Sequence, residues 1–410
     1  MAIVRPFRAL RPRPSDAARV AAVPYDVVNT EEARSQAGDN PLSFLRVSRS
    51  EVELPPATDP FSGDVYSRAA RNFERLKQST LVVEDEASVY LYRLRSGAHE
   101  QTGLAACFSL DEYDSGLIKR HELTRRDKED DRTRHMLALG AQTGPVFLVY
   151  RASDAIDALA ARAIVEAPLF DFTAPDGVRH TVWRATSAIG SALVSAFAQI
   201  ASLYIADGHH RAASAARARD AIRDGTTVPA LLDGDADHTT FLAVAFPHEQ
   251  VRILPYNRVV RDLGALAPPE FLSRVRQRFR VDDGHPMPSG KGEIAMYFEG
   301  QWRTLAPRAP SNAADPIGSL DVTVLQQQLL EPILGIRDVR TDGRIEFVGG
   351  GRGVGELERL VDSGAAAVAF SLYPVNIVEL MNVSDAGAMM PPKSTWFEPK
   401  LRDGLLIHSL

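Results

Sequence analysis

The chain has 410 residues, of which 45% are hydrophobic and 24% are charged, the balance of an ordinary soluble globular protein of two or three domains. No stretch approaches the roughly 18 consecutive apolar residues that a membrane helix needs, so no membrane partner is expected. The formal charge is −6 and the basic residues are scattered. This pattern argues against nucleic-acid binding, which leaves a concentrated basic surface.

Cysteine usage and the N-terminus bear on the cellular compartment. Cys107 is the only cysteine, which excludes an internal disulfide and a zinc site built from cysteines. Arginines lie among the first ten residues, where a secretory signal needs an apolar core. We therefore expect a cytoplasmic protein.

The first half of the chain alternates between apolar periods typical of strands and of helices. Val65, Ala69, Phe73 and Leu76 recur at helical spacing, for example. The pattern predicts a short strand within 1–10, a helix from about residue 30, a helix over 63–79, paired antiparallel strands over 88–95 and 103–110, a helix over 123–139 and a strand over 145–150.

The second half continues without strict alternation, which predicts an α+β fold. We expect three parts: an N-terminal α+β region (1–110), a core (111–265) and a C-terminal α+β region (266–410). The elements expected up to 265 are helices 155–164, 189–200 and 212–222 and strands 168–173, 179–185, 203–206 and 241–247. Those expected beyond it are helices 269–279, 322–330 and 356–363 and strands 293–298, 301–305, 345–348 and 367–372.

The most informative stretch is 203–216, in which an apolar run leads into Asp-Gly-His-His-Arg and then into a small-residue helix. A strand that delivers polar groups to a helix N-terminus suits a phosphate, because that end of a helix carries unpaired N–H groups and a partial positive charge. Gly208 allows close backbone approach, and Arg211 can bind phosphate oxygens in two places. Asp207 can hold a divalent cation such as Mg²⁺. The alternative is a tight turn in which the aspartate only caps the helix.

His209 and His210 admit three interpretations: metal ligands, phosphate donors or surface side chains. Adjacent side chains point in different directions, so we expect one histidine, His209, to face the phosphates and the other to pack or cap. No third nitrogen or sulfur ligand stands at recognisable spacing for zinc. His121-Glu122 is not a zinc-protease motif, because position 125 is arginine.

These residues resemble a known family. Asp207 to Arg211 resembles the signature of the ParB/sulfiredoxin-like superfamily, in particular of its free-serine kinases. The chain as a whole is similar to a bacterial and archaeal family catalogued as domain of unknown function 1015. Further shared marks stand at 24–27, 120–124, 254–259 and 390–400. The resemblance implies a ParB/sulfiredoxin-like core with N-terminal and C-terminal additions.

The resemblance also implies catalytic roles. A His-Glu pair upstream of the signature supplies the general base in the serine kinases, which assigns the base to Glu122, 85 residues before Asp207. A carboxylate suits this role, because the attacking hydroxyl must lose its proton. The alternative for Glu122 is an ordinary surface acid. Asp207 and His209 complete the implied catalytic set, with Asp207 as the metal ligand, and Gly208, His210 and Arg211 bind the phosphates.

The C-terminal run Pro-Pro-Lys-Ser-Thr at 391–395 resembles the substrate-side motif of the serine kinases. Lys393 presents a cation, and Ser394 and Thr395 present hydroxyl donors, which together suit a carboxylate or a phosphate. Trp396 stands where the kinases tend to carry charge or histidine. The alternative is a segment docked for stability.

Together these features predict a Mg²⁺-dependent kinase that transfers a phosphoryl group from ATP or ADP to free L-serine or a similar hydroxylated metabolite. The alternative is a nucleotide-binding switch, or a nucleotide hydrolase of ParB-like type. The expected partners are a small-molecule substrate and a nucleotide. The acceptor alcohol, the choice among ATP, ADP and CTP, and the oligomeric state are left open.

Overall fold

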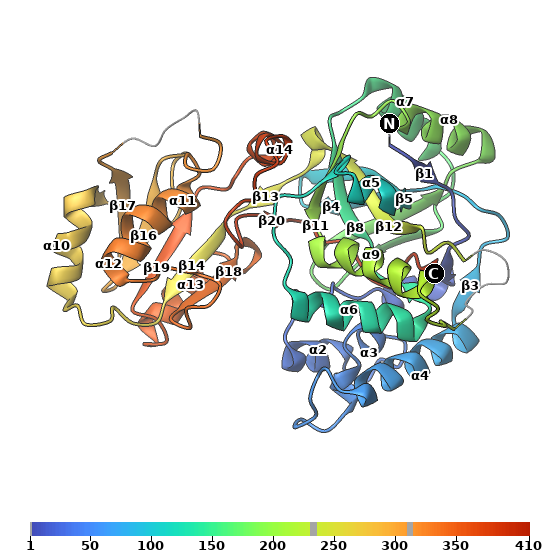
Figure 1. Ribbon diagram of the computed structural model, residues 1–410, viewed down its shortest axis with the longest axis horizontal. Coiled ribbons are helices and arrows are strands. Elements are labelled where there is room, and N and C mark those ends of the chain that lie inside the picture. Colours follow the sequence, from blue (N-terminus) through green and yellow to red (C-terminus); the bar gives the residue numbers. More distant parts are fainter. Residues whose placement is uncertain (1, 230–235, 310–314) are drawn as a thin grey trace. The chain divides into compact units, whose positions relative to one another are not determined.

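The computed structural model describes residues 2–229, 236–309 and 315–410 (Figure 1). Helices account for 36% and strands for 25% of the chain, and this mixture confirms the predicted α+β class. The chain forms two compact units. Unit 1 consists of Met1–Arg120, Thr124–Val251 and Pro399–Leu410, and unit 2 consists of His121–Leu123 and Arg252–Glu398.

A mixed sheet forms the centre of unit 1, and its described strands run in the order β6-β11-β8-β12-β5-β4-β10-β9, with β1 beside β5. Strand β8 pairs parallel with β12, and β6 pairs parallel with β11. Strand β12 is buried along its whole length, as expected of a central strand covered on both faces. These strands are β1 (Val4–Arg5), β4 (Tyr90–Ser96), β5 (His99–Ser109), β6 (Ile118–Lys119), β8 (Val146–Tyr150), β9 (Phe170–Thr173), β10 (Arg179–Arg184), β11 (Leu203–Asp207) and β12 (Thr240–Pro247).

The helices of unit 1 pack in two places. Helices α5, α7, α8 and α9 contribute apolar side chains to the core of the large sheet. Helices α2, α3 and α4, blue in Figure 1, pack in succession with α6 around a second apolar core. The helices are α1 (Ala17–Val20), α2 (Thr30–Ala37), α3 (Leu45–Ser48), α4 (Gly63–Ser79), α5 (Leu110–Asp114), α6 (Arg126–Leu139), α7 (Asp154–Ala163), α8 (Ser187–Phe197) and α9 (His209–Arg223), with 3₁₀ turns η1 (Pro14–Asp16), η2 (Ser50–Glu53) and η3 (His248–Gln250).

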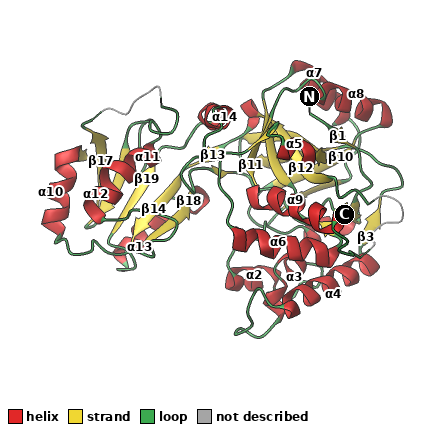
Figure 2. Cartoon of the chain, in the orientation of Figure 1, coloured by secondary structure: helices red, strands yellow, loops and turns green. Residues whose placement is uncertain are grey.

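Unit 2 contains an antiparallel sheet in the order β15-β17-β16-β19-β14-β18, flanked by short helices (Figure 2). A separate pair, β13 and β20, lies at the two ends of the long segment of this unit. The strands are β13 (Ile253–Leu254), β14 (Tyr256–Val260), β15 (Phe279–Asp283), β16 (Ile294–Phe298), β17 (Gln301–Pro307), β18 (Ile345–Gly349), β19 (Val368–Leu372) and β20 (Trp396–Phe397). The helices are α10 (Pro268–Arg278), α11 (Asp321–Leu325), the π-helical turn η4 (Gln326–Leu330), α12 (Glu331–Leu334), the 3₁₀ turn η5 (Gly350–Arg352), α13 (Gly355–Asp362) and α14 (Ile377–Asp385).

The last residues of the chain return to unit 1. Strand β21 (His408–Ser409) pairs with β7 (Ala141–Gln142), and Ile407 bridges Leu10 next to the pair of β2 (Leu10–Pro12) with β3 (Leu81–Val83). Residues 399–410 therefore complete unit 1 rather than a C-terminal region.

This division differs from the three parts expected from the sequence. Residues on the two sides of the expected boundary at 110/111 share one sheet, because β5 pairs with β12 in register from Thr240 opposite Ser109. The change to unit 2 comes after Val251. No helix within the described ranges has both the length and the apolar character that crossing a membrane requires.

Candidate active site

The turn between β11 and α9 carries the Asp-Gly-His-His-Arg signature. The apolar strand is buried up to Ala206, and Gly208 then takes a φ of +94°, a conformation that favours glycine. A Cβ atom at this position would also lie 3.4 Å from the Cα of Val146. The N-cap residue of α9 is Gly208, which has no side chain with which to cap the helix.

Asp207 is held by two contacts within unit 1. Its Oδ1 accepts a hydrogen bond from the backbone N–H of Gly208 at 3.0 Å, and its Oδ2 lies 3.0 Å from Nζ of Lys400. Burial alone raises the pKa of Asp207, but the charges of Lys400 and Arg211 lower it further than burial raises it. The pKa is therefore below its ordinary value, and the carboxylate is ionised at neutral pH.

Arg211 points away from the helix start into unit 1. Its guanidinium donates to the backbone O of Pro145 at 2.9 Å and to Oδ1 of Asp26 at 3.1 Å, and it lies 5.7 Å from the ring centroid of Tyr25. Burial lowers the pKa of Arg211, but Asp26 and Asp403 raise it above its ordinary value. These contacts tie the Pro-Tyr-Asp-Val stretch to α9, while phosphate binding by Arg211 stays a prediction.

Two further residues of this buried network were not expected from the sequence. The guanidinium of Arg132 lies 4.2 Å from the ring centroid of Tyr25. Asp403 is 3% exposed, and its burial raises its pKa to about 7 even though Arg211 lowers it. A Cβ atom on Gly144 would lie 2.3 Å from Oδ1 of Asp403, so only glycine leaves room for this carboxyl group. No local motif marks such pairs, because their partners are distant in sequence.

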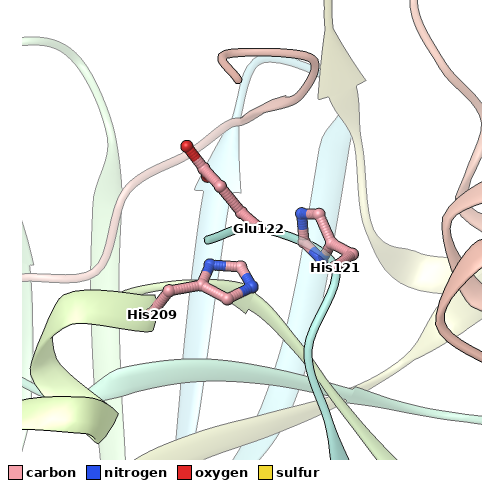
Figure 3. A group of neighbouring side chains, drawn as sticks. All are labelled: His121, Glu122 and His209. Carbon is pink, nitrogen blue, oxygen red and sulfur yellow. The ribbon is translucent and has the colours of Figure 1, made fainter. Parts of the chain in front are cut away.

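The two histidines of the signature have different surroundings, as the sequence predicts for adjacent side chains. Nε2 of His210 accepts a hydrogen bond from the backbone N–H of Arg125 at 3.0 Å. His209 is 5% exposed and projects from the start of α9 (Figure 3). One ligand atom from each of His121, Glu122 and His209 lies within 4.8 Å of the others.

This group of three side chains is a possible set of metal ligands that local spacing did not reveal. Two imidazoles and one carboxylate suit a first-row transition ion better than Mg²⁺, which prefers oxygen ligands.

The predicted substrate residues Lys393, Ser394 and Thr395 lie in unit 2. Lys393 has a φ of +58°, a strained conformation for a residue with a side chain, and its Nζ lies 5.5 Å from the ring centroid of Tyr256. The hydroxyl of Ser394 donates to the backbone O of Pro391 at 2.6 Å, which closes the turn. Substrate binding by these residues stays a prediction.

Arg258 supports this turn from beneath. It is 1% exposed and donates to the backbone O atoms of Tyr256 at 2.6 Å, Pro392 at 3.4 Å and Lys393 at 3.3 Å. Burial lowers the pKa of Arg258 to about 9. Arg258 stands in the shared stretch 254–259, and no local pattern in the sequence indicates this role.

Comparison with known proteins gives a family. The profile described as "Protein of unknown function (DUF1015)" matches residues 4–323. The chain belongs to this family. No curated protein matches the chain. The family description assigns no activity, so the function has to be argued from the residues.

Several solved structures are similar to the chain. A free serine kinase in complex with AMP is 14% identical, with a TM-score of 0.38, and the match covers 73% of this chain and 92% of that one. A conserved hypothetical protein from Pyrococcus furiosus is 14% identical, with a TM-score of 0.37 and coverage of 74% and 94%. SbnI from Staphylococcus aureus, truncated at its C-terminus, is 10% identical, with a TM-score of 0.37 and coverage of 73% and 85%.

Proposed function

We propose that this protein is a small-molecule kinase that transfers a phosphoryl group from ATP or ADP to the hydroxyl of free L-serine or a similar metabolite. The observation that carries the proposal is the turn at Gly208, where an ionised Asp207 and the ammonium of Lys400 flank a helix N-terminus without a side-chain cap. Many nucleotide sites bind polyphosphates through a backbone turn with positive φ, the N-terminus of a helix and a nearby cation. The resemblance of the signature to that of free-serine kinases supports the same assignment.

In this proposal the start of α9 binds the phosphates of the nucleotide. Gly208 lets the phosphate approach the backbone, and His209 and His210 lie in the first turn of the helix. Arg211 contributes positive charge and, through Asp26, holds the helix start in place. A fixed arrangement of donors stabilises the charge of the transferring phosphoryl group.

Glu122 is the proposed general base. The serine oxygen forms a bond to the terminal phosphorus of the nucleotide, the bond from that phosphorus to the leaving ADP or AMP oxygen breaks, and the hydroxyl proton passes to Glu122. His209 is the proposed partner that orients this carboxylate. General-base catalysis of this kind raises the rate of such reactions about 10²–10⁴-fold.

The carboxylate of Asp207 fits a Mg²⁺ ion, because it is ionised and Mg²⁺ takes one or two carboxylates together with phosphate oxygens and water. Such an ion, held by Asp207, would supply positive charge that stabilises the transferring phosphoryl group. Lys400 already compensates the charge of Asp207 at 3.0 Å, so we propose that Lys400 shares this carboxylate with the metal.

Lys393, Ser394 and Thr395 are the proposed substrate residues. The exposed Lys393 on a strained turn and the nearby hydroxyl group of Thr395 suit the carboxylate of an amino acid, while Ser394 holds the turn closed. A freely diffusing amino acid, an intracellular nucleotide and one buried cysteine, Cys107, fit an enzyme of the cytoplasm.

The test is to incubate the purified full-length protein with L-serine, Mg²⁺ and either ATP or ADP, and to measure O-phosphoserine by mass spectrometry. We expect product with at least one donor. Glu122→Gln should reduce kcat at least 100-fold and leave nucleotide affinity unchanged, whereas the control Glu31→Gln, an exposed carboxylate on α2, should change neither.

Absence of product with either donor, across a panel of hydroxylated metabolites, would contradict the kinase assignment. Nucleotide binding that raises the melting temperature without any product would instead identify a nucleotide-binding switch. Release of phosphate without a phosphorylated metabolite would identify a nucleotide hydrolase.

A further inference from the structure

A second cavity of unit 1 lies outside the site described above. Its volume is about 310 Å³, at the lower end of the range of small-molecule pockets. Strands β4 and β5 form one wall, helices α7 and α8 form another, and Gln250 lies at its edge. None of the signature residues lines it, so its ligand is not the nucleotide of the proposed function.

The inner wall of this cavity is apolar. Leu91, Leu104, Ile156 and Leu193 line it, and each is at most 2% exposed. Ala160 lines the cavity from α7 without filling it. A surface of this kind favours an aliphatic body, because each buried methylene contributes about 0.8 kcal/mol.

One pair of charges at the edge of the cavity is already neutralised. Nε of Arg93 lies 3.3 Å from Oε1 of Glu100, and the guanidinium of Arg93 lies 4.9 Å from the ring centroid of Trp183. Arg95 also donates to Glu100, at 2.7 Å. Glu100 therefore already has two cationic partners and does not compete with Asp157 for a ligand cation.

The other side of the cavity carries an uncompensated acid. Asp157 projects from α7 into the lining and is partly buried, and it has no ion pair or side-chain hydrogen bond to any residue in the described ranges. Burial, Asp154 and Glu249 all raise the pKa of Asp157, since both neighbours are acidic. A cation bound beside Asp157 would offset the repulsion between Asp157 and its two acidic neighbours.

A buried hydroxyl group lies in the same region. Tyr150 is 2% exposed and lines the cavity, and its ring packs edge-on against Phe197 at 5.0 Å between centroids. Burial and the charge of Asp157 both raise the pKa of Tyr150, so its hydroxyl lies close enough to this carboxylate to be affected by its charge. A ligand nitrogen held by Asp157 would therefore lie near this hydroxyl.

We propose that this cavity binds a small aliphatic primary ammonium ion, with its nitrogen against Asp157 and the hydroxyl of Tyr150 and its hydrocarbon chain against Leu104 and the apolar wall. The acid selects a cation, the hydroxyl oxygen accepts a hydrogen bond from one of its N–H groups, and the volume admits a short hydrocarbon chain. This site is independent of the proposed kinase activity.

The test uses three probes of equal length: n-pentylammonium, 1-pentanol and pentanoate. Each is titrated into the full-length protein with ¹³C-labelled methyl groups, and the NMR shifts of Ile156, Ala160 and Leu193 are followed. We expect saturable shifts with the ammonium ion, at least tenfold weaker binding of the alcohol and no binding of the carboxylate.

Two variants separate charge from shape. Asp157→Asn should weaken ammonium binding at least tenfold, and Ala161→Phe, which fills the exposed edge of the cavity, should abolish it. The control Asp64→Asn on α4 removes an exposed carboxylate elsewhere and should leave binding unchanged. Urea unfolding of each variant verifies that it is folded.

Equal affinity for pentylammonium and pentanol, or an Asp157→Asn variant that binds the ammonium ion as well as the wild type does, would overturn the proposal. The absence of saturable shifts with all three probes would overturn it as well. None of these outcomes depends on whether the chain phosphorylates serine.

Discussion

The ammonium of Lys400 lies 3.0 Å from the carboxylate of Asp207, although 193 positions separate the two residues in the chain. The sequence motif alone predicted a phosphate-binding turn, and Lys400 stood in the shared stretch 390–400 without an assigned partner. In the structure Lys400 belongs to unit 1 and compensates the charge of the signature aspartate. Replacement of Lys400 should therefore affect both the stability of the protein and its catalytic activity.

Lys400→Met should lower the free energy of unfolding at pH 7 by about 1–3 kcal/mol, because it leaves a largely buried carboxylate without its cation. The pKa of Asp207 is lowered in the folded state, so the pair stabilises the protein above the unfolded pKa of about 3.9 and loses this effect as the pH falls through the folded value. Urea unfolding at pH 7 and pH 3 should show a difference between wild type and variant that shrinks at low pH. A difference that is independent of pH would contradict this account.

Gly208→Ala should lower the free energy of unfolding by about 1–2 kcal/mol, because φ is +94° at this position. It should also weaken ATP binding at least tenfold, since the methyl group lies where the phosphate approaches. Gly225→Ala is the control, because Gly225 has a φ of +96° after the other end of α9 and open space around its Cα. It should lose similar stability and keep full nucleotide affinity by calorimetry.

Asp403→Asn should change how stability depends on pH. The folded pKa of Asp403 is about 7, above the unfolded value of about 3.9, so the native state binds an extra proton in this window and wild-type stability falls as the pH rises through it. The neutral asparagine lacks this dependence, and the variant should gain about 2–4 kcal/mol relative to wild type between pH 4 and pH 8. Urea unfolding at four pH values tests whether wild-type stability falls relative to the variant as the pH rises. A stability difference between the two proteins that does not change with pH would refute this prediction.

Lys393→Gly should stabilise the protein by about 0.5–1 kcal/mol, because glycine relieves the strain of a positive φ at some cost in entropy. The same change should raise KM for serine at least tenfold, since the proposed substrate cation is lost. Glu299→Gly is the matched control: Glu299 has a φ of +50° in the turn between β16 and β17, and its replacement should stabilise the protein without changing KM. Unchanged KM in Lys393→Gly would remove Lys393 from the substrate site.

Long, strongly periodic elements could be predicted from the sequence. Helix α4 occupies Gly63–Ser79 as expected, because its apolar residues recur along one buried face. Helix α9 was expected from residue 212 and begins at His209, since Gly208 in the left-handed conformation starts the helix before its apolar pattern begins. Strand β14 was missed because it contains buried polar residues, Asn257 and Arg258.

Helix α14 was also missed, although its signal is in the sequence. Asn376 and Glu379 form a capping box in which each side chain accepts a hydrogen bond from the other residue's backbone N–H. The short, mixed pattern between Pro374 and Ala386 obscured the helix that follows this cap.

The residues of the candidate site fall into two groups by how visible they are in the sequence. Asp207 and Gly208 stand in one contiguous run with an interpretable order of residue types, so their turn could be foreseen. Asp26, Arg132 and Asp403 act through partners far away in the chain, and only the folded structure pairs them. The burial of Asp403, which raises its pKa, cannot be recognised from the neighbouring residues in the sequence either.

The pairing of residues 399–410 with the rest of unit 1 has a consequence for folding. Ile407 bridges Leu10, and Lys400 lies 3.0 Å from Asp207, so segments far apart in the sequence must come together before the signature turn has its native surroundings. A partly folded chain in which residues 399–410 are detached holds Asp207 without its cation. Docking of this segment, rather than formation of the turn alone, should therefore complete the surroundings of Asp207.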